Sequence, residues 1–510
     1  MTLKQIQAQI YGGEKCWSSI VKLAPCEAAC PLNMRVSDYA SAIGRERFSE
    51  AYAVMREATP LVAVCGYVCH HPCEASCIRG QVDEPIAIRA LKRFVADQVL
   101  SGGLGKPAPT ESYRSEKVAI IGSGPAGLAA AESLTRRGFG VTIFEAMPVA
   151  GGMLAAGIAE FVLPRKVLEA EIGLIQGLGV EIRTGTTIAS VEDLLGQGYA
   201  AVFLAVGAHR SVKLDLPGFD MEGVISALPL LQEANLGKGT KLQGRVLVIG
   251  GGNVGVSAAR VAARLGATEV SIVYRRTRAE MPAFAWEVQE AEEEGVKIHC
   301  SLAPQRVIAR DGRAGGVTLA PVKSMGVDKE GGATPQLAEG PEQTMDADTV
   351  IVAIGQAPAL PSLPGMDIAP NGVVVVDPYS LATSVPGVFA GGDVVVGAGA
   401  GTVVEAIAAG KRAASSIDSY LRGLEPDESP QAAAWEVAED MVPRFVEKRS
   451  RRPEPLLPRA ERTRSSQVVE MAYSRKDAVE EARRCLNCSM CGNCMFDHIQ
   501  MCHETGTRLL

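Results

Sequence analysis

The sequence predicts an α/β fold in which two Rossmann-like, mononucleotide-binding domains are flanked by two cysteine-rich segments. Two observations carry this prediction. An aliphatic strand, a glycine turn and a run of small residues occur in that order twice, at Val118–Gly127 and at Val246–Gly255. Twelve of the thirteen cysteines fall into two groups, one between Cys16 and Cys77 and one between Cys485 and Cys502.

Length and composition limit the possible classes of protein. A chain of 510 residues exceeds what one hydrophobic core serves, so several domains are expected. The net charge of −7 leaves no broad basic surface for a nucleic acid partner. The first residues contain no apolar signal core, and no run reaches the roughly 18 apolar residues of a membrane span. We therefore expect a cytoplasmic protein.

Changes of pattern along the chain mark the domain boundaries. A small α-helical domain is expected first, because Ile86–Asp97 has apolar residues at helical spacing, and a Gly- and Pro-rich linker follows. The strand in Gly387–Asp393 and the helix-like Val403–Leu421 resume the first nucleotide-binding domain, which indicates that the second is inserted into it. The expected segments are a helical domain at 1–105, the first nucleotide-binding domain at 115–235 and 373–423, the inserted domain at 240–372, a linker at 424–472 and a C-terminal cysteine module at 473–510.

The first glycine motif fits a dinucleotide. Gly122, Gly124 and Gly127 follow a strand and open a helix, so backbone N–H groups can approach a pyrophosphate. The next strand ends in Glu145, which can accept a hydrogen bond from an adenosine ribose hydroxyl.

The second motif differs at the position that selects the nucleotide. After Gly250, Gly252 and Gly255, the next strand ends in the arginines of Arg275–Arg278 instead of an acidic residue. Arginine suits a ribose 2′-phosphate, which favours NADPH over NADH. A solvated surface cluster of arginines is the alternative interpretation.

These residues carry a resemblance to a known family. The first glycine motif with Glu145, the Gly391-Gly-Asp393 segment, the stretch Tyr274–Ala283 and the N-terminal cysteines resemble the glutamate synthase small-subunit family. That family includes the electron-entry half of dihydropyrimidine dehydrogenase. The resemblance implies two Rossmann-like domains of the disulfide-reductase type, with FAD in the split domain and NAD(P)H in the inserted one. It also implies that Asp393 bonds the ribityl or phosphate part of FAD, and that the backbone of Gly401–Val404 lies near the isoalloxazine ring.

The motifs and the resemblance together indicate one set of cofactor-binding residues. For FAD they are Gly122, Gly124, Pro125, Ala126, Gly127, Glu145, Gly152, Gly392, Asp393, Thr402 and Val403. For NAD(P)H they are Gly250, Gly252, Asn253, Val254, Gly255, Arg275, Arg276 and Gly355. No catalytic side chain is expected, because hydride transfer needs none. Glu287 and Glu294 are candidates near the nicotinamide, but their pattern favours a solvated helix face.

The N-terminal cysteines suggest iron–sulfur ligation. Cys26-x3-Cys30-Pro and the run Cys65, Cys69, Cys73, Cys77 match the family domain in which cysteines surround two [4Fe–4S] clusters. Two departures limit the match: the distant Cys16 stands where a closer pair is usual, and Lys92 or Arg93 stands where relatives have a Gln or Glu ligand. Seven cysteines cannot supply eight ligands, so one cluster has an unusual fourth ligand or only one forms. Buried structural cysteines and zinc are alternatives.

The C-terminal cysteines resemble a bacterial ferredoxin run. Cys485, Cys488, Cys491 and Cys494 are spaced by two residues, and Cys502 follows. One [4Fe–4S] cluster is expected here, and a zinc knuckle that uses His498 or His503 is the alternative.

The sequence also predicts how electrons leave. Disulfide reductases use a cysteine pair beside the flavin, but only Cys300 lies between residues 78 and 484. We expect hydride transfer from NAD(P)H to FAD, followed by single electrons through the clusters to ferredoxin, another protein acceptor or a larger complex. A glutamate synthase small subunit and a non-catalytic wiring or assembly subunit are the alternatives.

Overall fold

The computed structural model describes residues 23–103, 110, 114–327, 333–395, 401–424, 446–464 and 466–488. The chain forms two compact units. The first contains residues 1–105, 428–454 and 472–510, and the second contains residues 106–427 and 455–471. In the described ranges, no helix combines the length and the apolar character that crossing a membrane requires.

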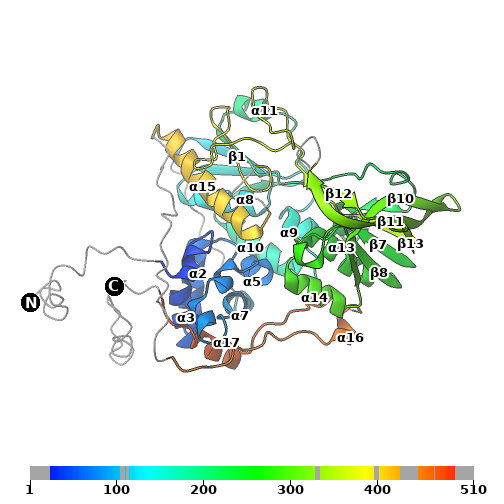
Figure 1. The fold of residues 1–510 in the computed structure, drawn as a ribbon. Coiled ribbons are helices and arrows are strands. Elements are labelled where there is room, and N and C mark those ends of the chain that lie inside the picture. The colour runs from blue at the N-terminus through cyan, green and yellow to red at the C-terminus, as the bar shows by residue number, and fades with distance from the viewer. Residues whose placement is uncertain are drawn as a thin grey trace, which may run out of the picture. The chain divides into compact units, whose positions relative to one another are not determined.

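The first unit is helical, as predicted. Its central helix α7 (Ile88–Ser101) packs against α4, α5 and α17, and its Leu91 and Phe94 are at most 1% exposed. The other elements are α2 (Pro25–Ala28), α3 (Val36–Gly44), α4 (Phe48–Ala58), α5 (Val62–Val68), α6 (Pro72–Ala75), η2 (Ile78–Gln81) and α17 (Arg475–Ala482). Figure 1 shows α17 beside α3 and α7, although these helices are far apart in the sequence. The C-terminal segment is therefore part of the helical unit as far as Cys488, the last described residue.

The first sheet of the second unit is parallel, in the order β16-β4-β1-β2-β3. Its strands are β1 (Lys117–Ile121), β2 (Gly140–Phe144), β3 (Glu181–Arg183), β4 (Tyr199–Leu204) and β16 (Val388–Ala390). Strand β16 pairs with β4, so the chain returns to this sheet after the second one. Helices α8 (Pro125–Arg136) and α15 (Val403–Leu421) pack side by side (Figure 1). Gly410 allows this approach, because a Cβ there would lie 2.1 Å from the Ala126 carbonyl oxygen.

The second sheet is also parallel, in the order β6-β14-β7-β8-β9. Its elements are β6 (Val224–Ser226), α12 (Ala227–Asn235), β7 (Arg245–Ile249), α13 (Asn253–Arg264), β8 (Glu269–Tyr274), η3 (Arg278–Glu280), α14 (Ala285–Glu293), β9 (Lys297–Cys300) and β14 (Thr349–Val352). Strand β6 pairs with β14, so it belongs to this sheet although it precedes the expected domain start at residue 240. The sequence hides this strand, because three residues carry no periodicity.

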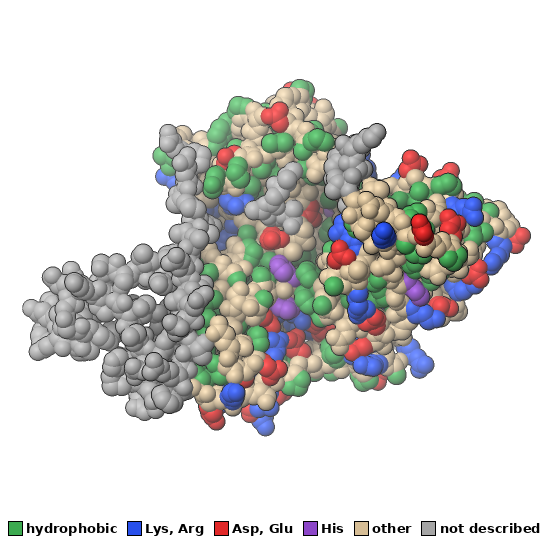
Figure 2. Space-filling view, in the orientation of Figure 1, with side chains coloured by type: hydrophobic (Ala, Val, Ile, Leu, Met, Phe, Trp, Pro, Cys, Tyr) green, Lys and Arg blue, Asp and Glu red, His purple; other side chains and the backbone are tan. Residues whose placement is uncertain are grey.

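An antiparallel sheet, absent from the sequence expectations, is inserted between β9 and β14. It contains β10 (Leu302–Arg310), β11 (Arg313–Val327), β12 (Ala333–Leu337) and β13 (Gln343–Asp346). Acidic and basic side chains are intermixed on the visible face over these strands (Figure 2). The remaining elements of the unit are α9 (Met153–Ala156), α10 (Arg165–Gly177), α11 (Val191–Gly196), β5 (Arg210–Ser211), β15 (Gln356–Ala357) and α16 (Arg459–Arg462).

Candidate functional site

A cavity of about 610 Å³ opens at the carboxyl ends of the first sheet. The turn between β1 and α8 forms one wall, and the segment before α15 forms another. Ten of the predicted FAD residues line it: Gly122, Gly124, Pro125, Ala126, Glu145, Gly152, Gly392, Asp393, Thr402 and Val403. Gly127 lies behind the turn, where a Cβ would be 2.0 Å from the Gly122 carbonyl oxygen.

The buried Glu145 lines this cavity and is held by hydrogen bonds. One carboxylate oxygen accepts hydrogen bonds from the Ser123 N–H at 2.9 Å and from the Ser123 hydroxyl at 2.5 Å. The other accepts from the Met147 N–H at 2.8 Å. A carboxylate offers about four acceptor sites, so Glu145 remains able to accept from a ribose hydroxyl. These bonds fix the carboxylate before any ligand arrives.

The glycines of the first turn have two different functions. Gly122 has a φ of +106°, and a Cβ there would lie 2.3 Å from the Ala205 carbonyl oxygen, so the fold requires glycine. Gly124 has an extended backbone, and a Cβ there would meet nothing within 4 Å. That open space at the N-terminus of α8 is where a pyrophosphate fits. The turn therefore suits FAD.

A second cavity, of about 980 Å³, lies at the carboxyl ends of the second sheet. Seven predicted NAD(P)H residues line it: Gly250, Gly252, Asn253, Val254, Arg275, Arg276 and Gly355. Gly255 lies behind the turn, as Gly127 does in the first. Gly252 repeats the open geometry of Gly124, because the nearest atom to an added Cβ is 3.9 Å away.

The two cavities adjoin. Val254, Gln356, Asp393 and Gly401 line both of them. Asp393 is held in place there, because it accepts a hydrogen bond from the Gly401 N–H at 2.8 Å. Two nucleotides bound at the two glycine turns can therefore bring their redox rings together at this junction.

The arginines after β8 do not form one surface cluster. Arg278 is engaged by Glu292, with two hydrogen bonds of 2.5 and 2.7 Å. Arg275 and Arg276 line the cavity instead. The buried Nε of Arg276 has no hydrogen-bond acceptor within the described ranges. A cationic group with unused donors at this place suits a phosphate.

Eight of the described cysteines lie in the first unit, and none of them forms a disulfide. One set surrounds the buried Lys92: burial alone would lower its pKa, but the thiolates of Cys69, Cys65, Cys73 and Cys30 raise it. The other set comprises Cys26, Cys77, Cys485 and Cys488. Burial and then these neighbouring thiols raise the pKa of Cys26. Four of the predicted cysteine ligands, Cys16, Cys491, Cys494 and Cys502, lie outside the described residues, as do His498 and His503.

A buried orphan donor shows that the cysteine sites fit a sulfur-rich group. The Tyr39 hydroxyl is fully buried, and no described residue accepts its hydrogen bond. Burial raises the pKa of Tyr39, and its neighbours Cys73, Cys26 and Cys30 raise it further. The sulfides of an iron–sulfur cluster would satisfy this O–H, which otherwise costs free energy.

Comparisons with known proteins agree with this geometry. Residues 116–413 match the pyridine nucleotide-disulphide oxidoreductase family. Residues 4–103 match dihydropyrimidine dehydrogenase domain II, a 4Fe-4S domain. The small chain of NADPH glutamate synthase from Escherichia coli is 33% identical, over 78% of this chain and 88% of its own length.

The chain belongs to the glutamate synthase small-subunit family of pyridine nucleotide-disulphide oxidoreductases.

Two other relatives are more similar in sequence. The beta subunit of NADP(+)-dependent formate dehydrogenase from Moorella thermoacetica is 42% identical, over 92% of this chain and 71% of its own length. The beta subunit of NADPH-Fe(3+) oxidoreductase from Geobacter sulfurreducens is 36% identical, over 91% and 75%. FprA from Mycobacterium tuberculosis, solved with NADPH, shares the fold at a TM-score of 0.52 and 18% identity, over 61% of this chain and 85% of its own. This family member is therefore an FAD-dependent NAD(P)H oxidoreductase with iron–sulfur centres.

Two features of this family member escaped the sequence analysis. His209 lines the FAD cavity, where burial lowers its pKa against the opposing charges of Glu145 and Asp393. No motif surrounds it, so only the fold reveals it. Glu294 was expected on a solvated helix face, but its side chain is 0% exposed and pairs with Arg260 and Arg264. That expectation was wrong, because the partners come from α13, which periodicity alone does not place. Neither Glu287 nor Glu294 lines either cavity.

We expect Glu294→Gln to destabilise the second unit by about 3–5 kcal/mol, because two arginines would lose a buried counter-charge. Glu292→Gln is the matched control: its pair with Arg278 is exposed and should contribute less than about 1 kcal/mol. Denaturant unfolding of both variants measures the difference. Equal losses of unfolding free energy in the two variants would contradict a larger contribution from the buried Glu294 pairs.

The difference in stability between the wild type and Glu294→Gln should depend on pH. Burial alone would raise the pKa of Glu294, but Arg264 and Arg260 lower it. A lowered pKa means that the pairs stabilise the fold at neutral pH. This contribution is lost as pH falls through the folded pKa, so wild type and Glu294→Gln should converge in stability in acid.

Proposed function

We propose that this chain is the subunit through which electrons from NADPH enter a larger oxidoreductase complex. The observation that carries the proposal is the junction at Val254, Gln356, Asp393 and Gly401, where the two nucleotide cavities meet. The names of the Moorella and Geobacter relatives support it, since both are beta subunits that use NADP(H). A protein acceptor or a ferredoxin would then take the electrons onward.

The residues of this chain bind and orient the cofactors. The N–H groups at the starts of α8 and α13 would hold the two pyrophosphates, and Glu145 would hold a ribose of FAD. Bound FAD would supply the conversion of a hydride from the nicotinamide into single electrons for iron–sulfur clusters. Asp393 and Gly401 would keep the junction in shape while this occurs.

The proposal includes a cytoplasmic location. The nine described cysteines are without disulfides, and the eight in the first unit must be reduced to bind iron. A reducing compartment supplies both conditions.

The nucleotide preference tests the role of the arginines. Arg276→Ala should lower kcat/KM for NADPH by about 10–100-fold, because a charge-assisted hydrogen bond to the 2′-phosphate contributes roughly 1.5–3 kcal/mol. The value for NADH should hardly change. Steady-state reduction of ferricyanide measures both values in the isolated chain.

Arg278→Ala is the control for this experiment, because Arg278 is engaged by Glu292 outside the cavity. It should change neither value. Equal losses with NADPH and NADH in Arg276→Ala would contradict the assignment of Arg276 to the 2′-phosphate.

A glutamate synthase small subunit is the second candidate, favoured by the Escherichia coli relative. That activity would require a second chain that processes glutamine. The two candidates differ in partner only, so they share the nucleotide chemistry described above.

A further inference from the structure

Two C-terminal cysteines, Cys485 and Cys488, belong to the same unit as the N-terminal ones. Helix α17 ends at Ala482, and the Cys485 N–H donates to the Ala482 carbonyl oxygen at 3.1 Å. Cys485 and Cys488 follow within the first unit, which also contains Cys26 and Cys77. Four thiols from three distant segments of the chain therefore belong to one compact unit.

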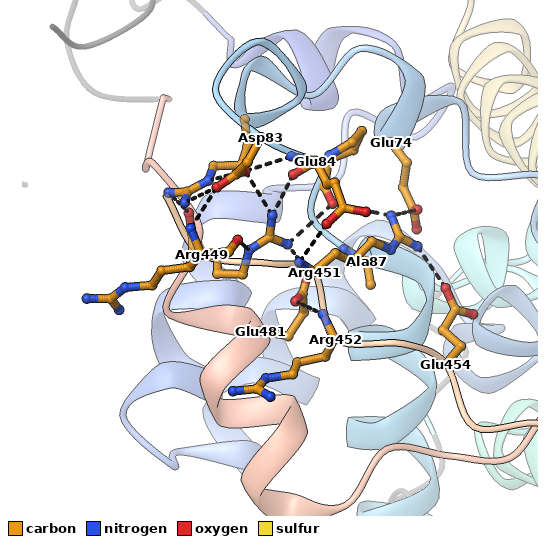
Figure 3. Close-up of polar contacts among 12 residues, drawn as sticks. Glu74, Asp83, Glu84, Ala87, Arg449, Arg451, Arg452, Glu454 and Glu481 are labelled. Atoms are coloured by element: carbon orange, nitrogen blue, oxygen red, sulfur yellow. Dashed lines mark hydrogen bonds and ion pairs between the residues drawn. The ribbon is translucent and has the colours of Figure 1, made fainter. Parts of the chain in front are cut away.

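A buried ionic network fixes the end of α17 at this place (Figure 3). The Arg484 side chain is 2% exposed and donates to Asp83 at 3.0 Å and to Glu481 at 2.7 Å. Glu481 also accepts from the Ala87 N–H at 2.9 Å and from the Arg452 N–H at 2.9 Å. Breaking such buried ion pairs costs free energy, so they hold α17 in this position.

The same network joins the segment after Cys77 to Cys485. The Arg79 guanidinium donates to the Arg484 carbonyl oxygen at 3.2 Å. Arg79 lies two residues after Cys77, and Arg484 directly precedes Cys485. Helices α2 and α6 pack together, which brings Cys26 to the segment that ends at Cys77.

The loop around Cys485 repeats the local geometry of a loop in the other cysteine set. The His71 N–H donates to the Cys69 sulfur at 3.4 Å, and His71 has a φ of +45°. Asn487, two residues after Cys485, likewise has a positive φ, of +51°. Backbone N–H bonds to ligand sulfurs are a regular means of tuning iron–sulfur clusters.

We propose that Cys26, Cys77, Cys485 and Cys488 ligate a single [4Fe–4S] cluster, so that the C-terminal segment completes an N-terminal site. The ligand count supports this assignment. Cys30, Cys65, Cys69 and Cys73 are the other four described cysteines of the first unit, so each of two clusters then has four thiolates. The C-terminal pair thereby replaces the closer N-terminal pair that the family usually has, and Lys92 is a buried counter-charge rather than a ligand.

Zinc is the competing occupant. A single zinc ion needs its sulfurs gathered at about 2.3 Å from one centre. In the described part of the chain, no three His, Cys, Asp or Glu side chains are placed to hold one ion. In a cubane each thiolate binds a different iron, so iron and sulfide analysis separates it from a single zinc ion.

Pairs of Cys→Ser substitutions test the assignment in the full chain, purified anaerobically, with iron and acid-labile sulfide measured per FAD. C26S/C77S and C485S/C488S should each remove about four irons, and the quadruple variant should lose no more than either pair. Losses that add to about eight irons in the quadruple variant would overturn the proposal. Zinc in place of iron and sulfide in the wild type would also overturn it.

Matched variants control the experiment. C30S/C73S should remove about four irons, and this loss should add to that of C485S/C488S. Cys300 lies in the second unit, so Cys300→Ser should remove no iron. FAD per chain should stay constant, which shows that the second unit remains folded.

If a pair destabilises the whole first unit, single variants decide the question. In the electron paramagnetic resonance spectrum of dithionite-reduced protein, C488S and C26S should alter the same cluster signal and leave the one altered by C73S unchanged. Changes in different signals would overturn the proposal. The cluster assignment rests on the proposed function. Reduction by dithionite and iron counting do not require NADPH, so these experiments can contradict the cluster assignment without contradicting the proposed function.

Discussion

Gly124→Val is expected to yield a folded protein that no longer retains FAD. Valine fits the extended backbone at this position, with φ −67° and ψ −179°, and its Cβ would meet no atom within 4 Å. The added methyl groups would instead fill the space in front of the α8 N-terminus, where we propose that the pyrophosphate binds. Absorbance of the purified protein near the flavin band measures the loss, and NADPH oxidation should disappear with it.

Gly173→Val is the control for this experiment. Gly173 lies in α10, lines neither cavity, and also leaves open space for an added side chain. It should keep its full flavin content. A Gly124→Val protein that binds FAD normally would show that the turn does not hold the pyrophosphate.

Gly252→Val should separate the two nucleotide sites. Its backbone is also extended, and the nearest atom to an added Cβ is 3.9 Å away, so the fold should tolerate valine. Loss of two charge-assisted hydrogen bonds to the NADPH pyrophosphate would cost roughly 3–6 kcal/mol, which lowers kcat/KM at least about 100-fold. FAD content should be unchanged.

The second measurement is the bleaching of the flavin when dithionite reduces the Gly252→Val protein directly. Dithionite should bleach the flavin of Gly252→Val as in the wild type, because only the NADPH site is blocked. A normal rate with NADPH would place the nucleotide elsewhere than at the β7–α13 turn.

The sequence could predict those structural features that a short local pattern encodes. Both glycine turns, and a helix with the bounds Val403–Leu421, depend on residues within one short stretch. The resemblance then supplied what local patterns lack, namely FAD in one turn and NAD(P)H in the other. The distinction between Gly122, required by its positive φ, and Gly124, left open for a ligand, needed the three-dimensional contacts.

Contacts between residues that are far apart in the sequence could not be predicted from it. Spacing suggested that Cys485 and Cys488 belong to a separate C-terminal module, because a C-x2-C repeat looks self-sufficient. The structure places both cysteines in the helical unit, where the Arg79 guanidinium donates to the Arg484 carbonyl oxygen, and no local pattern encodes that contact. The buried pairs of Glu294 were missed for the same reason.

Anaerobic mixing of the isolated chain with NADPH tests the central claim most directly, with stopped-flow absorbance and freeze-quench electron paramagnetic resonance recorded together. We predict that the flavin bleaches first and that signals of reduced iron–sulfur clusters appear afterwards, without any added partner. A flavin that bleaches while every cluster stays oxidised, or one that NADPH does not bleach, would contradict the account.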